Sequence, residues 1–103
     1  MDHKDLEVWK KSMDLVVKVY QITQMFPDTE KYGLTSQMRR AAVSIPSNIA
    51  EGAARKGDKE LIQFLSISIG SLSELETQYL IAIRLGFVTR EATFDLQLID
   101  VEK

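Results

Sequence analysis

The sequence of 103 residues has no cysteine and a single histidine, His3. Without cysteine the chain can form no disulfide bond, thiolate metal site or thiol nucleophile, so a cytoplasmic location is the default expectation. One histidine near the N-terminus cannot supply the paired ligands of a di-iron bundle or the usual Ser-His and zinc sites of enzymes. We therefore expect no enzymatic activity, no bound metal and no cofactor.

Long hydrophobic runs are missing as well. The most apolar stretch, residues 61–85, is interrupted by polar side chains that include Glu74, Gln78 and Arg84. No segment offers the roughly 18 to 20 uninterrupted apolar residues of a membrane span, and the charged N-terminus has no apolar signal-peptide region. The formal net charge is −2. These features predict a soluble cytoplasmic protein with no membrane partner and no small-molecule substrate.

Glycine and proline interrupt the sequence at only a few places, and the segments between them repeat apolar residues with a helical period. This pattern predicts four helices, at about residues 6–25, 35–55, 58–85 and 89–103. Four amphipathic helices joined by short connections are typical of an antiparallel bundle. The predicted fold is therefore all-α: an antiparallel up-and-down four-helix bundle that forms a single domain over residues 1–103.

The third predicted helix is the best defined. Its seam alternates steps of four and three, the spacing of a heptad repeat, through Leu61, Leu65, Ser68, Leu72, Leu75, Tyr79 and Ala82. Asp58 is its predicted N-cap, and Gly86 is expected just past its end. Thr35 and Thr89 are the predicted N-caps of the second and fourth helices.

Pro46 falls inside the second predicted helix, where proline removes one backbone donor and crowds the preceding turn. The apolar stripe nevertheless keeps its phase across the proline, through Met38, Ala42, Ile45, Ile49 and Ala53. We therefore predict one helix that is kinked at Pro46 rather than two separate helices.

The first predicted helix has a wide apolar arc. One stripe contains Trp9, Met13, Val16 and Tyr20, and a second contains Val8, Leu15, Val19, Ile22 and Phe26. Together they span about 220°, whereas one core-facing stripe needs only about 100°. The third helix also carries Ile67, Ile81 and Leu85 away from its seam. Uncovered apolar patches of this kind are unusual on a monomer, so we predict a homo-oligomer in which every subunit buries the same patches.

A set of polar residues on the second helix forms the first candidate site. It comprises Gln37, Arg40, Asn48 and Glu51, together with Ser44 and Arg55 at the same helical spacing and Arg39 to the side. One interpretation is a solvated face on which Glu51 and Arg55 form an ordinary ion pair four residues apart. The other is a polar network across a helix or subunit interface, where arginine and asparagine give directional hydrogen bonds.

A basic cluster at Arg55, Lys56 and Lys59 is the second candidate site. Residues 39–59 contain five basic and two acidic side chains, and a ring would repeat that excess in every subunit. The cluster either contacts nucleic-acid phosphates or belongs to an ordinary solvated loop. Two functions therefore stay open, a scaffold that binds partner proteins and a nucleic-acid-binding accessory protein. The acidic net charge and the lack of an aromatic-basic RNA-binding signature favour the scaffold.

Much of the chain is similar to a known family. The segments that carry the similarity are residues 5–12, 26–27, 32–52 and 64–78, and they resemble the four-helix-bundle family named after proteins encoded in intervening sequences of bacterial 23S rRNA genes. The resemblance implies a homopentameric ring, often with a central channel, no enzymatic activity and no settled biological role. A related group is similar to the accessory variability proteins of diversity-generating retroelements, which are pentamers that work with a reverse transcriptase and nucleic acid.

The resemblance also bears on the polar set of the second helix. The stretch most characteristic of the family contains Arg39, Arg40, Asn48, Glu51 and Gly52. Because the family has no known ligand, the resemblance implies that these residues serve structure or an interface and are not catalytic. It therefore favours the network interpretation over the solvated one.

Overall fold

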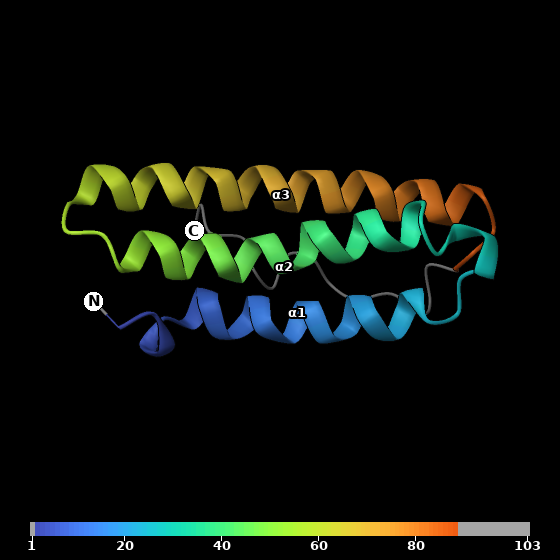
Figure 1. Ribbon diagram of the computed structural model, residues 1–103, viewed down its shortest axis with the longest axis horizontal. Helices are drawn as coiled ribbons and strands as arrows, with labels where there is room; N and C mark the ends of the chain where they lie inside the picture. Colours follow the sequence, from blue (N-terminus) through green and yellow to red (C-terminus); the bar gives the residue numbers. More distant parts are fainter. Residues whose placement is uncertain (1, 89–103) are drawn as a thin grey trace.

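The computed structural model describes residues 2–88, which contain three α-helices and two short 3₁₀ helices (Figure 1). The α-helices are α1 (Glu7–Thr23), α2 (Leu34–Ala53) and α3 (Asp58–Arg84). The 3₁₀ helices are η1 (His3–Asp5) and η2 (Asp28–Glu30). No strand occurs within residues 2–88, which confirms the all-α prediction. The fourth predicted helix, residues 89–103, lies outside the described residues.

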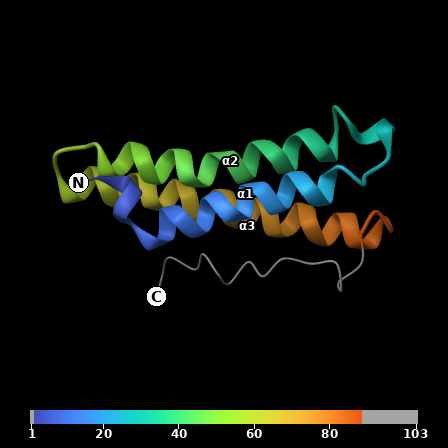
Figure 2. The same ribbon diagram turned by 90° about the horizontal axis from the view of Figure 1, so that it is seen from below.

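The three helices run up, down and up, with α2 antiparallel to both of its neighbours (Figures 1 and 2). α2 packs against α1 on one side and more extensively against α3 on the other. It is therefore the element that determines how α1 and α3 lie relative to each other.

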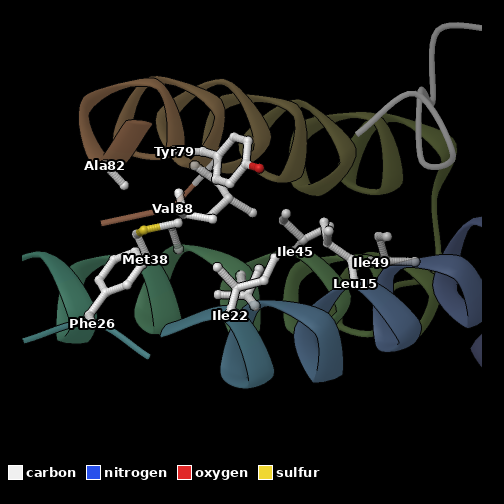
Figure 3. Packing of buried hydrophobic residues seen from close by; sticks show 13 residues of the cluster. Leu15, Ile22, Phe26, Met38, Ile45, Ile49, Tyr79, Ala82 and Val88 are labelled. Atoms are coloured by element: carbon white, nitrogen blue, oxygen red, sulfur yellow. The ribbon is translucent and has the colours of Figure 1, made fainter. Parts of the chain in front are cut away.

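The hydrophobic core runs along the inner sides of these helices (Figure 3). α2 contributes Met38, Ala41, Ala42, Ile45 and Ile49, α1 contributes Leu15, Val19 and Ile22, and α3 contributes Leu75, Tyr79 and Ala82. Phe26 and Val88, from the segments that follow α1 and α3, complete the cluster. The seam predicted for the third helix thus supplies the α3 part of the core.

The two apolar stripes of α1 differ in burial, because one faces the core directly and the other reaches it only through the partly buried Trp9 and Val16. Leu15, Val19 and Ile22 are buried, whereas Met13 and Tyr20 on the other stripe are 43% and 42% exposed. The wide apolar arc therefore has a buried part and, at Met13 and Tyr20, an exposed part within the described residues 2–88.

The helix ends differ in part from the predictions. α2 begins after Gly33 and not after Thr35, because the carboxylate of Glu30 accepts a hydrogen bond from the backbone N–H of Leu34 (3.0 Å) and so satisfies the first turn. The N-cap of α3 is Gly57, and Asp58 is the first helical residue. An acidic side chain in the first turn still favours the helix N-terminus electrostatically.

The end of α3 follows the prediction. Gly86 adopts a positive φ of 79°, and its N–H bonds to the carbonyl oxygen of Ile83 (3.0 Å). The N–H of Phe87 reaches the carbonyl oxygen of Ala82 (2.9 Å), which completes a Schellman motif. The turn brings the Phe87 ring to 5.4 Å from that of Phe26, between ring centres. The cap therefore also joins the end of α3 to the segment after α1.

α2 is helical without a break through Pro46, which confirms one helix rather than two. At this point the Oγ atom of Ser68 donates a hydrogen bond to the carbonyl oxygen of Ile45 (3.0 Å). α3 therefore holds the α2 backbone directly at the residue before the proline.

α2 and α3 also approach closely at Gly52. A Cβ atom built on Gly52 would lie 2.8 Å from Cβ of Phe64 and 3.3 Å from the carbonyl oxygen of Leu61. Glycine is needed here because two backbones meet where a side chain would separate them.

We expect Gly52→Ala to lower the free energy of unfolding by about 1–2 kcal/mol, because overpacking outweighs the gain in helix propensity. Gly70→Ala is the matched control: nothing lies within 4 Å of a Cβ atom there, so it should raise stability by about 0.5–1 kcal/mol. Urea unfolding followed by circular dichroism measures both. Equal effects of the two substitutions would contradict the close approach at Gly52.

We expect Pro46→Ala to fold normally and to unfold at the same or a higher urea concentration, because alanine restores an N–H donor within a continuous helix. The same unfolding measurement tests this. Loss of folding would show that the proline is required for the path of α2.

Candidate functional site

A small hydrogen-bond network joins α2 to α3. The Nδ2 atom of Asn48 donates to the carbonyl oxygen and to the Oγ atom of Ser44, at 2.8 and 2.9 Å. The Oγ atom of Ser44 lies 2.9 Å from the Oγ atom of Ser71 on α3. Each serine hydroxyl has one hydrogen to donate, and the single hydrogen bond between Ser44 and Ser71 uses only one of these two hydrogens. One hydroxyl hydrogen of the pair is therefore left over for a further acceptor.

The two serines form the floor of a surface groove of about 340 Å³ between α2 and α3. The groove is lined by Gln37, Arg40, Ala41, Ser44, Ser71 and Glu74. It thus contains one positive and one negative side chain, and among the described residues no ion pair involves either of them. The structure brings Gln37 and Arg40 of the predicted set to this groove and links Asn48 to its floor.

Gln78 adds a buried polar group next to this groove. It is only 5% exposed, and its Nε2 atom makes a long 3.4 Å hydrogen bond to the Oε2 atom of Glu74. Its Oε1 atom is buried and has no hydrogen-bond partner. A buried acceptor without a donor is destabilising by about 1–3 kcal/mol, so such groups are rare in folded proteins.

Arg39 points to α1, away from the groove. Its Nε atom donates to the Oγ1 atom of Thr23 (2.8 Å), and its Nη2 atom donates to the carbonyl oxygen of Tyr20 (3.3 Å). The guanidinium group also lies 4.4 Å above the Tyr20 ring centre. A cation at the C-terminal end of α1 is favourable for the helix dipole. Arg39 thus joins α1 to α2 and does not belong to the groove.

Glu51 and Arg55 form an ion pair of 2.7 Å, with both side chains about half exposed (51% and 49%). Arg55 also lies 5.2 Å from the centre of the Phe64 ring. An exposed pair of this kind contributes little to stability. This part of the polar set matches the solvated interpretation, whereas Asn48 bonds within the network between α2 and α3.

The basic cluster lies at the turn between α2 and α3. Lys56 and Lys59 are exposed, and no ion pair among the described residues involves them. Arg55 is already paired, and Asp58 and Glu60 lie in the first turn of α3. The free positive charge of the cluster is therefore mostly that of the two lysines.

Two outward apolar surfaces complete the candidate site. We call Met13, Val17 and Tyr20 the α1 outer stripe, and their exposed fractions are 43%, 56% and 42%. We call Ile67, Ile81 and Leu85 the α3 outer stripe, with 49%, 43% and 57% exposed. A surface hollow lined by Val16, Val17, Tyr20, Gln21, Gln24 and Arg39 lies on the α1 outer stripe.

The sequence analysis missed the polar middle of the α3 outer stripe. Ile67, Ser71, Glu74, Gln78, Ile81 and Leu85 alternate steps of four and three, so α3 has a second heptad seam beside the one that faces the core. This spacing could have identified Ser71, Glu74 and Gln78. A search for apolar residues alone does not detect this second seam, because polar residues occupy its centre.

Nothing in residues 2–88 has the arrangement of a metal centre: no group of three His, Cys, Asp or Glu side chains comes together there. His3 packs edge-on against Trp9, with 5.0 Å between the ring centres. Within the same residues, no helix combines the length and the apolar character required to cross a bilayer.

Comparison with known protein families gives a match. The model of a family described as 23S rRNA-intervening sequence protein matches residues 4–100, nearly the whole chain. No curated protein matches the sequence.

Proposed function

Because this chain belongs to the 23S rRNA-intervening sequence protein family, we propose that it is a non-enzymatic scaffold that assembles as a homopentameric ring and holds partner proteins. In this proposal residues 89–103 form the fourth helix of the bundle, and α2 bends at Pro46. Since the chain has no cysteine to form disulfides, we place the scaffold in the cytoplasm. The number of five subunits comes from the resemblance to the family.

The observation that supports assembly is the pair of outer stripes. Val17 and Leu85 are more than half exposed, and their apolar neighbours on the same stripes are more than two fifths exposed. Exposed large apolar residues that share a helix face on a small domain are typical of an interface. Closed cyclic assembly buries the same surface in every subunit.

Light scattering during size-exclusion chromatography tests the assembly. At micromolar concentration we expect a single species with five times the chain mass of 11.7 kDa. Native mass spectrometry then counts the subunits. A monodisperse species of 11.7 kDa would contradict the proposal.

A second candidate function, binding of nucleic acid, is favoured by the exposed Lys56 and Lys59. A ring would place five copies of this charge around one axis. Phosphate binding releases counterions, so log affinity should fall with log salt concentration by about 0.9 per phosphate for duplex DNA and about 0.7 for single strands.

Filter binding to single-stranded RNA and duplex DNA over a salt series tests this candidate. If the cluster binds phosphates, a variant with Arg55, Lys56 and Lys59 all changed to Glu should lose binding. A control that changes Lys4 and Lys31, which lie outside the cluster and outside α1 and α3, to Glu should retain it. No binding at low salt, or equal binding by the cluster variant, would reject the candidate.

A further inference from the structure

We infer that neighbouring copies in the proposed ring meet head to tail, with the α1 outer stripe of one copy packed on the α3 outer stripe of the next and covering the groove between α2 and α3. This inference rests on the proposed assembly and names the surfaces that form it. Its occupant is a second copy of this chain.

The two stripes cannot meet within one chain, because α2 stands between them. Arg39 faces α1 and stacks on Tyr20, whereas the next residue, Arg40, lines the groove beside Glu74 of α3. The α1 outer stripe therefore lies along one edge of the exposed face of α2, and the α3 outer stripe lies along the other edge. A contact between α1 of one copy and α3 of another joins two different surfaces. Repetition of such a contact gives a closed ring when the rotation that relates neighbouring copies is a whole fraction of a full turn.

The charges of the two helices are complementary. α1 carries three basic and two acidic side chains, whereas α3 carries two basic and four acidic side chains. Pairing of α1 with α3 therefore brings opposite net charges together, while pairing of α3 with itself brings like charges together. The charge distribution favours the head-to-tail contact over a two-fold contact between identical helices.

The groove supplies the polar centre of this interface. Arg40 and Glu74 both line the groove. When a second copy covers it, each of these two charges therefore has the opposite charge nearby. The leftover hydroxyl hydrogen of the Ser44–Ser71 pair is available for an acceptor on a neighbouring copy, and Gln21 and Gln24 lie beside the α1 outer stripe with amide oxygens that can accept it. A polar group within an otherwise apolar helix contact fixes its register.

The test uses one charged substitution in each stripe, Val17→Glu and Ile81→Glu. Each variant alone should be a folded monomer by circular dichroism and light scattering, with association weakened at least a hundredfold. Thr77→Glu places a glutamate at an exposed position of α3 outside its stripe and should leave assembly unchanged.

Mixing the two stripe variants gives the decisive result. The intact α3 stripe of the Val17→Glu variant can pair with the intact α1 stripe of the Ile81→Glu variant. The remaining α1 and α3 stripes each carry a new glutamate and cannot pair. We expect a one-to-one heterodimer that grows no further, detected by native mass spectrometry with one variant labelled with ¹⁵N, at about 1 μM to 1 mM protein.

The other outcomes each overturn the inference. If either variant alone forms a homodimer, identical stripes pair with each other. If the mixture stays monomeric, the two stripes do not pair. If Val17→Glu lowers thermal stability and leaves assembly intact, residues 89–103 of the same chain cover the α1 stripe. A monomeric wild-type chain would instead refute the proposed assembly itself, so the two failures are distinguishable.

Discussion

α2 and α3 touch through small residues, and the rest of the structure depends on this contact. At Gly52 no Cβ atom separates the helices, and farther along Ser68 donates to the carbonyl oxygen of Ile45. Because the backbones lie this close, the large side chains of α3 must point to either side of the contact. One set, the predicted heptad seam, faces the core, and the other set forms the α3 outer stripe. The same packing that builds the core therefore also leaves apolar surface outside.

α2 distributes its polar residues to both neighbours. Arg39 reaches Thr23 and Tyr20 of α1, whereas Arg40 lines the groove on the α3 side. Asn48 bonds within the contact between α2 and α3, because it donates to Ser44, whose hydroxyl pairs with Ser71 of α3. The polar set predicted from the sequence thus separates into a link to α1, a groove beside α3 and an exposed ion pair. Two of these parts lie beside an outer stripe: Arg39 contacts Tyr20 of the α1 outer stripe, and the groove lies at the polar middle of the α3 outer stripe.

Spacing predicted α1, α2 and α3 well but not the direction of every side chain. The seam of α3, the turn at Gly86 and the uninterrupted α2 followed from periodicity and from the positive φ that glycine accommodates. The start of α2 did not follow from spacing, because the hydrogen-bond acceptor for its first turn is the carboxylate of Glu30 in the preceding 3₁₀ helix. Both stripes of α1 consist of large apolar residues, so only the packing reveals that Leu15, Val19 and Ile22 are buried while Met13 and Tyr20 are exposed. Whether Arg39 or Arg40 faces α1 likewise depends on where Thr23 lies.

The absence of cysteine makes the proposed contact between copies directly measurable. In a Val17→Cys, Ile81→Cys double variant, a bismaleimide crosslinker can join only these two positions. A head-to-tail ring predicts a ladder of covalent oligomers on a denaturing gel that ends at five chains, and it predicts uncrosslinked monomers for each single-cysteine variant. Dimers from either single variant, or monomers alone from the double variant, would contradict it.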